Sequence, residues 1–113
     1  MVKRESKSDS FVQFIGEQLS DLPEIRIKAM FGGHGIYSGP IMFGILAKGR
    51  LYFRVDDVTR KQYVASGMGP FMPYDEQAMK SYYEVPPDCI ESPAELLELA
   101  RQSIVTARKA KKK

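Results

Sequence analysis

The chain has 113 residues, of which 43% are hydrophobic and 27% charged, and its net charge is +3. This length fits one compact domain that is stable without disulfides or metals. The composition excludes collagen-like, disulfide-scaffold and wholly disordered chains. No apolar run reaches the ~18–20 residues of a membrane span, and the polar start MVKRESKSDS lacks the apolar segment of a secretory signal. We therefore expect a small soluble domain.

The first helix is predicted after a disordered lead-in over residues 1–9. Ser10-Phe11-Val12-Gln13 has the S-x-x-Q form of a capping box. Apolar residues then recur at helical spacing up to Pro23, which is expected to end the helix. They are Phe11, Ile15, Leu19 and Leu22.

A first strand is predicted over Ile25–Met30, where apolar residues alternate with Arg26 and Lys28. A turn-prone glycine-rich stretch, residues 31–35, separates it from Ile36-Tyr37. The following Ser38-Gly39-Pro40 forms either a second turn or a bulge inside one long strand.

The centre of the chain predicts a hairpin. Residues 41–47 are almost wholly apolar, as expected of a central strand covered on both faces. Lys48-Gly49 supplies a tight two-residue turn, because glycine tolerates a positive φ. Residues 51–55 then alternate as a second strand.

The second half predicts a helix, two extended segments and a final helix. Asp56 or Asp57 is expected to cap a helix over residues 58–66, which Gly67 ends. Residues 69–73 form a loop or a short edge strand, and residues 81–85 a strand closed by Pro86-Pro87. Ser92-Pro93-Ala94-Glu95 opens the last helix. Its apolar stripe comprises Leu96, Leu97, Ala100, Ile104 and Ala107.

The predicted fold is therefore one α+β domain over residues 10–108, with a lysine-rich tail over residues 109–113. The element order is α-β-β-β-α-β-β-α, and its short connections favour an antiparallel sheet backed by helices in two layers.

The positive charge is concentrated at the C-terminus. Residues 1–10 carry +1 and residues 101–113 carry +6, so residues 11–100 hold the remaining −4 of the net +3. The tail is a candidate for weak, salt-sensitive contact with nucleic acid. Its alternative role is a solubilising end that complements the dipole of the last helix. The candidate nucleic-acid residues are Arg108, Lys109, Lys111, Lys112 and Lys113.

The sequence offers no catalytic or metal-binding constellation, so we expect no enzyme activity, cofactor or metal. The single Cys89 has no disulfide or CxxC partner, which favours the cytosol. The lone His34 is interpreted as a loop or core residue. The alternative is a small-molecule pocket beside the Tyr82-Tyr83 strand, with the surrounding glycines forming a weak anion site.

One feature of the sequence favours a sheet that binds nucleobases. Tyr52 and Arg54 share a face of their strand, as in sheets that stack nucleobases on aromatic rings beside basic residues. The flanking strands show no matching basic–aromatic rows and residues 11–100 are acidic overall, so we interpret the aromatic residues mainly as core.

Two blocks of sequence carry a family resemblance, AMFGGHGIY at residues 29–37 and SYYEVP at residues 81–86, with RLYFRVD at residues 50–56, Thr59-Arg60 and Pro73-Tyr74 between them. From residue 11 to residue 108 the chain resembles the N-terminal domain of the TfoX/Sxy competence regulators. The chain stops where full-length regulators continue into a second helical domain.

The resemblance implies a two-layer, secretion-chaperone-like α+β fold in a bacterial cytoplasmic protein. It also implies a non-enzymatic regulator of DNA-uptake genes that binds a protein such as the cyclic-AMP receptor protein. Self-association as a homodimer is a further expectation, and a nucleic-acid-binding accessory role is the alternative. The candidate partner surface consists of Met30, Phe31, Gly32, Gly33, His34, Gly35, Tyr82, Tyr83 and Glu84.

Overall fold

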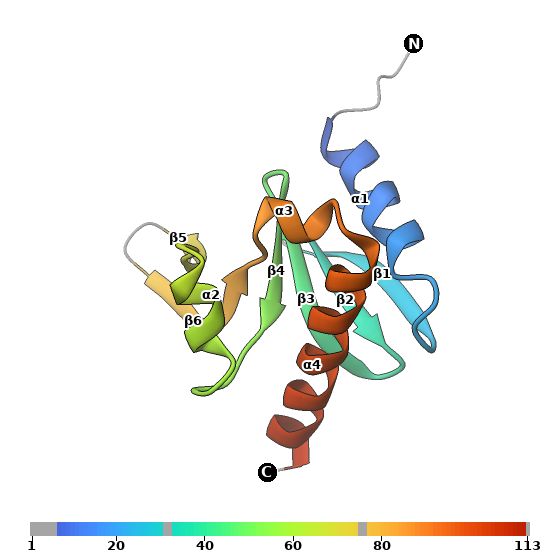
Figure 1. Ribbon diagram of the computed structural model, residues 1–113. Coiled ribbons are helices and arrows are strands. Elements are labelled where there is room, and N and C mark those ends of the chain that lie inside the picture. Colours follow the sequence, from blue (N-terminus) through green and yellow to red (C-terminus); the bar gives the residue numbers. More distant parts are fainter. Residues whose placement is uncertain (1–6, 31–32, 75–76, 113) are drawn as a thin grey trace.

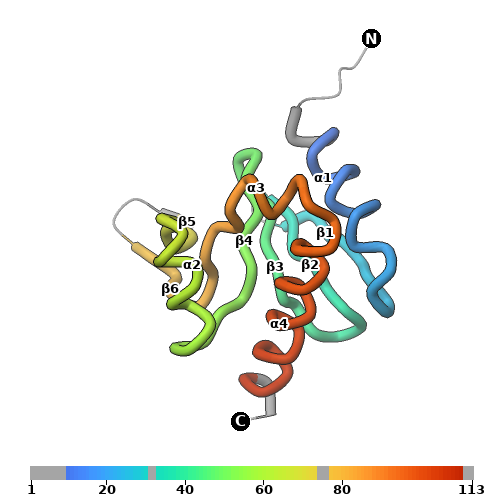
Figure 2. The backbone as a smooth tube through the Cα atoms, viewed as in Figure 1, coloured from blue at the N-terminus to red at the C-terminus, as the bar shows by residue number. Residues whose placement is uncertain are grey.

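The computed structural model describes residues 7–30, 33–74 and 77–112. Its elements are α1 (Lys7–Gln18), β1 (Ile25–Met30), β2 (Gly33–Ser38), β3 (Ile41–Ala47), β4 (Arg50–Arg54), α2 (Arg60–Ala65), β5 (Pro70–Tyr74), β6 (Gln77–Glu84), α3 (Pro87–Ile90) and α4 (Pro93–Lys112). The strands form one antiparallel sheet in the order β1-β2-β3-β4-β6-β5, with the helices on one face (Figures 1 and 2). The predicted α+β class and two-layer architecture are confirmed.

The structure decides between the two interpretations of Ser38-Gly39-Pro40 in favour of a turn. Gly39 has a φ of +59° and its N–H donates a hydrogen bond of 2.9 Å to the Glu24 carbonyl oxygen. The predicted order of helices and strands holds, with β2 as a separate strand before this turn and the short α3 as an addition. The β2–β3 ladder also has an irregularity, between Ile36 and Tyr37.

The helix ends differ from the sequence-based boundaries. Helix α1 begins at Lys7, so Ser10 lies inside it and the lead-in predicted over residues 1–9 is too long by three described residues. No glycine or proline interrupts residues 7–9, which lets the helix begin one turn before the capping pattern. Helix α4 begins at Pro93, as predicted, and continues to Lys112, so the lysine-rich end is helical up to that residue.

The tight turn between β3 and β4 forms as expected. Both of its residues have positive φ, +55° at Lys48 and +75° at Gly49. This is the combination that a two-residue type I′ hairpin requires, and its twist matches that of the strands. It aligns Leu46 with Leu51, both fully buried against the helices.

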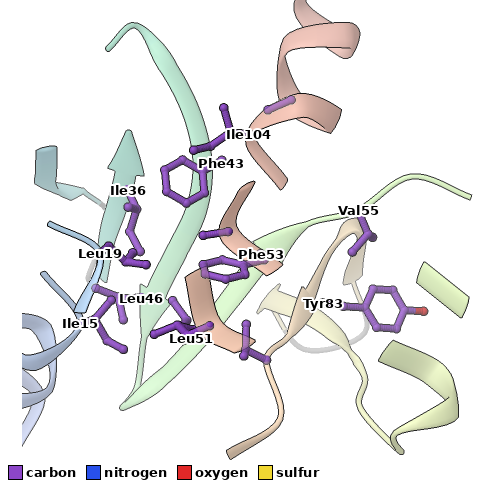
Figure 3. Close-up of a cluster of buried hydrophobic side chains, with 14 of the residues drawn as sticks. Ile15, Leu19, Ile36, Phe43, Leu46, Leu51, Phe53, Val55, Tyr83 and Ile104 are labelled. Carbon is purple, nitrogen blue, oxygen red and sulfur yellow. The ribbon is translucent and has the colours of Figure 1, made fainter. Parts of the chain in front are cut away.

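The main core lies between the sheet and the helices (Figure 3). The Phe43 and Phe53 rings lie at its centre, 5.8 Å apart between centroids. Around them pack Ile15, Leu19, Ile36, Leu46, Leu51, Val55, Tyr83 and Ile104. The buried Ser103 hydroxyl donates a 2.8 Å hydrogen bond to the Arg54 carbonyl oxygen, which attaches α4 to the end of β4. None of the helices in the described part of the chain is long and apolar enough to cross a membrane.

Candidate functional site

The face of the sheet opposite the helices holds an apolar pocket of about 260 Å³, here called the methionine pocket. Ile45 and Tyr52 reach this face because they alternate with Leu46 and Leu51, which point into the core. Four of the six methionines of the chain line the pocket. Its apolar lining includes Met30, Met42, Ile45, Phe71, Met72 and Met79.

The pocket exists because the sheet curves. Strands β1 and β2 lie at one end of the strand order and β5 and β6 at the other, yet all four contribute to one cavity. The Tyr52 ring on β4 contacts the Phe71 ring on β5, with centroids 4.9 Å apart, although β6 lies between the two strands. Ile45 pairs with Tyr52 and is only 7% exposed, although it does not belong to the main core.

Gly35 provides room for two thioethers at the base of the pocket. A Cβ atom on Gly35 would lie 2.7 Å from the Met30 sulfur and 3.0 Å from the Met42 sulfur. Any side chain at this position would therefore displace one or both methionines. The glycine of the predicted family block thus shapes the pocket without lining it.

Gly33 has a different constraint. A Cβ atom there would lie 2.5 Å from the Leu46 carbonyl oxygen, which belongs to the backbone of β3. The two strands approach each other too closely for a side chain, so this glycine is required by the fold.

His34 lies on β2, where it pairs with Ala29 on β1 and Leu46 on β3. It is half-buried and contributes to the methionine pocket. In the strand order β3 and β4 separate β2 from β6, yet His34 and Met79 line the same pocket, and Met79 lies on the strand that carries Tyr82 and Tyr83. His34 therefore lies in a pocket beside that strand, as in the predicted alternative, although neither tyrosine lines the pocket.

The second family block does not form one surface. Tyr83 points into the core, where its ring lies 6.5 Å from the Tyr63 ring. Tyr82 points to the opposite face, is 2% exposed, and lies under Arg54, whose guanidinium carbon is 5.6 Å from the ring centroid. Burial raises the pKa of Tyr82. The Glu84 carboxylate accepts a 3.1 Å hydrogen bond from Arg50 in an ion pair.

Basic and aromatic residues do share the helix-free face, contrary to the expectation that the flanking strands lack such rows. Arg26 and Lys28 on β1 lie over the Tyr37 ring of β2, at 5.8 Å and 5.6 Å from its centroid. On β4 and β6, Arg54 and Tyr82 repeat the arrangement. The rows arise from the pairing of different strands, which sequence alternation alone does not show. The rings are half-buried or buried, so they offer little area for stacking.

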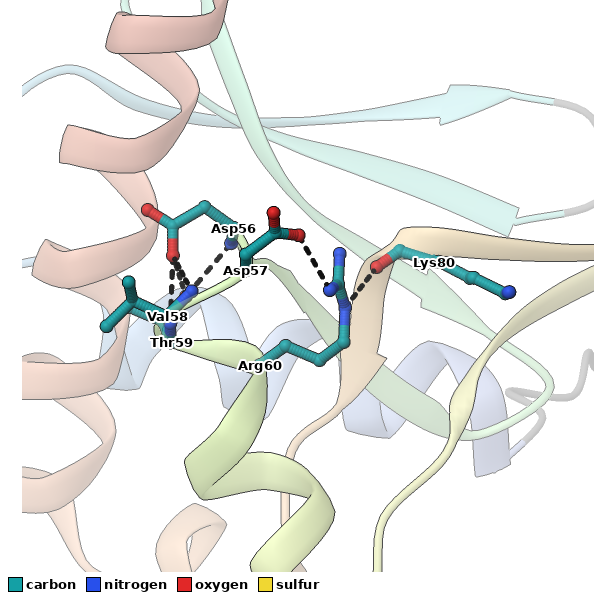
Figure 4. Close-up of polar contacts among 6 residues, drawn as sticks. All are labelled: Asp56, Asp57, Val58, Thr59, Arg60 and Lys80. Atoms are coloured by element: carbon teal, nitrogen blue, oxygen red, sulfur yellow. Dashed lines mark hydrogen bonds and ion pairs between the residues drawn. The ribbon is translucent and has the colours of Figure 1, made fainter.

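The acidic residues after β4 have a structural role (Figure 4). Asp56 accepts hydrogen bonds from the N–H groups of Val58 and Thr59, at 3.0 and 2.8 Å, and its own N–H donates to the Thr59 hydroxyl at 3.0 Å. The hydrogen bond from the Thr59 N–H is the main cause of a lowered pKa at Asp56, and Lys109 adds an attraction. Asp57 instead pairs with Arg60 at 2.9 Å. Asp56 therefore caps the turn that leads into α2, as one of the two predicted acids, but the helix begins at Arg60 with Thr59 as its N-cap, two residues later than predicted.

Cys89 is half-buried at α3, and burial raises the pKa of its thiol. A raised pKa disfavours the reactive thiolate form of this cysteine. No group of His, Cys, Asp or Glu within residues 7–30, 33–74 and 77–112 has the arrangement of a metal site.

The C-terminal basic residues lie along the last turns of α4. Arg108 and Lys109 are exposed, and Arg108 lines a shallow groove beside Pro23 and Pro40. Of the other predicted site residues, Phe31, Gly32 and Lys113 lie outside the described residues, as do the side chains of Lys111 and Lys112.

Sequence reasoning missed most of the pocket. Met42, Ile45, Phe71, Met72 and Met79 were not singled out as site residues. The available signal was alternation with the buried Leu46, which places Ile45 away from the core side. The same alternation would place Met42 on the core side, and Met42 reaches the face of Ile45 only because the β2–β3 ladder is irregular between Ile36 and Tyr37. Nothing local indicates that β5 and β6 curve towards them.

The comparisons with known proteins agree with this fold. The family model described as the TfoX N-terminal domain matches residues 17–107, which is most of the chain and includes both sequence blocks. A search of curated proteins finds no match. The matched region contains the whole sheet, both sequence blocks and most of α4, so the chain belongs to the family of TfoX N-terminal domains.

Proposed function

We propose that this domain acts without catalysis, by binding a protein partner in the bacterial cytoplasm during the regulation of competence genes. Membership of a competence-related family supports the regulatory role. The structural roles of the ionisable residues in the sequence blocks support a binding function. Glu84 is held by Arg50, Tyr83 is part of the core and His34 lies within the sheet.

The observation that carries the proposal is the helix-free face of the sheet. It combines an apolar pocket with the exposed cations Lys28, Lys48 and Arg50. Apolar centres surrounded by polar and charged groups are typical of protein interfaces. By the resemblance of the chain, the cyclic-AMP receptor protein is the first partner to test.

The test combines a binding measurement with a genetic one. Calorimetric titration of the full chain into the cyclic-AMP receptor protein of the same bacterium, with cyclic AMP present, is expected to show saturable binding. Deletion of the gene is expected to lower the transcripts of DNA-uptake genes, and the wild-type chain to restore them. Unchanged transcripts after deletion would contradict the regulatory proposal, and binding to no regulator would contradict the proposed partner.

A nucleic-acid-binding accessory role is the second candidate, because α4 carries the C-terminal cations on an ordered helix up to Lys112. Ala107 is a core residue, so the test should neutralise charges and leave the helix intact. A chain with glutamine at Lys109, Lys111, Lys112 and Lys113 is compared with the wild type in DNA titrations at about 50 and 200 mM salt. Steep salt dependence that disappears with these changes supports this candidate, and binding that survives them contradicts it.

A further inference from the structure

The methionine pocket has the size of an anchor site for a side chain. Small-molecule and cofactor sites usually enclose roughly 300–1,000 Å³, whereas this pocket encloses about 260 Å³. Its lining is mainly apolar, so it suits one or two apolar side chains of a peptide better than a polar cofactor.

The lining suits more than one kind of anchor. Methionine is unbranched and polarisable, and proteins use it on surfaces that adapt to different apolar partners. Met72 and Met79 are 44% and 37% exposed, so both remain accessible from solvent. Met30 and Met42 lie deeper, where Gly35 leaves space for their sulfur atoms.

The charges around the pocket favour an acidic partner. Lys48 lines the pocket, Arg50 pairs across the hairpin with the lining residue Ala47, and Lys28 precedes Met30 by two residues on the same strand face. Among the described residues of the strands, this face carries one carboxylate, that of Glu84. It is already paired with Arg50 at 3.1 Å. Residues 11–100 are acidic overall, so these cations form a basic region on an otherwise acidic body.

We infer that the methionine pocket receives an apolar side chain from an acidic segment of a partner protein, with Lys28 and Lys48 contacting the acidic flanks. This inference rests on the proposed protein-binding function and specifies its surface and the chemistry of its partner. Complementary charge at the rim increases the association rate and selects the partner, while the buried anchor supplies affinity.

The test uses fluorescein-labelled twelve-residue peptides and fluorescence anisotropy with the full chain. One panel carries a central Leu, Ile, Met, Phe or Trp between aspartate and glutamate flanks. Matched peptides replace the flanks by asparagine and glutamine, or replace the anchor by alanine. We expect the best acidic peptide to bind, and either replacement to weaken it by roughly tenfold or more.

Two variants and a matched control test the location and the role of charge. Met79→Glu places a negative charge at the pocket and is expected to weaken binding by roughly tenfold or more. Val64→Glu, on the exposed surface of α2 and 54% exposed, is the matched control and should bind as the wild type does. Lys48→Asn, which tolerates the positive φ, should weaken binding of the acidic peptide but not of the amide-flanked one.

Three outcomes would overturn the inference: no binding by the whole acidic panel, equal binding of acidic and amide-flanked peptides, or wild-type binding by the Met79→Glu variant. The genetic test separates this failure from failure of the proposed function. If Met79→Glu and Val64→Glu both restore the transcripts in the deletion strain, the regulatory role stands and the pocket is not its surface.

Discussion

The rings of Tyr52 and Phe71 lie 4.9 Å apart between centroids, tilted by 55°, although β6 separates their strands. This contact joins the curved end of the sheet to its centre and closes one side of the methionine pocket. Burial is the main cause of a raised pKa at Tyr52, with a further contribution from the negative charge of Glu84. The same contact therefore affects stability, pocket shape and the titration of a tyrosine.

Replacing Phe71 by alanine should separate these effects. We expect Phe71→Ala to lower the free energy of unfolding by about 1–2 kcal/mol, less than for a fully buried phenylalanine because the ring is half-buried. The pKa of Tyr52 should move down towards its ordinary value as the ring becomes solvated. Urea denaturation and ultraviolet titration measure the two effects, with Phe71→Leu as the control that retains most of the packing. An unchanged tyrosine titration would contradict the assignment of burial to this contact.

Two neighbouring glycines should respond differently to alanine. In Gly33→Ala the new Cβ meets a backbone oxygen of β3, so the strands must shift, and we expect a loss of about 1–3 kcal/mol. In Gly35→Ala the new Cβ meets the movable thioethers of Met30 and Met42, and the loss should stay below about 1 kcal/mol. Thermal and urea unfolding of the pair measures the difference. Equal losses would show that the pocket methionines are as rigid as the backbone.

Stability should fall in alkaline solution because of the buried Tyr63 and Tyr82 and the half-buried Tyr52. Burial is the main cause of raised pKa values at Tyr52, Tyr63 and Tyr82. A folded-state pKa above the unfolded value means that the folded protein holds the proton more tightly. This stabilisation is complete below the ordinary tyrosine value of about 10 and is lost as the pH rises through the folded values.

The measurement is the free energy of unfolding from about pH 8 to pH 11, by urea titration at each pH. Tyr63→Phe removes the most strongly shifted hydroxyl and should make the alkaline decline shallower. A decline as steep as in the wild type would contradict the role of Tyr63.

The hydrogen bonds between Asp56 and Thr59 predict an effect in acid. The pKa of Asp56 is lowered in the folded state, chiefly by the hydrogen bond from the Thr59 N–H. Its stabilisation is therefore present above the unfolded value of about 3.9 and is lost as the pH falls through the lower folded value. Asp56→Asn should reduce the fall in the free energy of unfolding at low pH. Asp56→Ala should lower the free energy of unfolding at neutral pH by about 1 kcal/mol.

Asp57 is the matched control for this carboxylate. Its side chain is 96% exposed and its ion pair with Arg60 lies on the surface, where such pairs contribute little. Asp57→Asn should leave the free energy of unfolding at neutral pH nearly unchanged. A larger effect at Asp57 than at Asp56 would contradict the capping assignment.

Features determined by a few neighbouring residues could be predicted from the sequence. Lys48-Gly49 indicates a tight hairpin because both residues must adopt positive φ, and Ser92-Pro93 marks the start of α4 through its capping chemistry. The start of α1 was wrong because a four-residue capping pattern does not prevent helix formation before it.

The methionine pocket could not be predicted because it depends on contacts between distant segments. Met30 and Met79 are separated by 49 positions in the chain and by three strands in the sheet, and they line one pocket only because the sheet curves. For the same reason the Arg26–Tyr37 contact was missed, since it requires the register of β1 and β2.

The most direct test of the anchor site is methionine-methyl NMR on the full chain, with ¹³C-labelled methyl groups, during titration with the acidic peptide that binds best. We expect the signals of Met30, Met42, Met72 and Met79 to shift together and to saturate with one affinity. Met68 packs against the main core outside the pocket and serves as the internal control, so its signal should stay in place. Saturable binding that shifts Met68 and leaves the four pocket signals unchanged would contradict the assignment of this pocket as the binding surface.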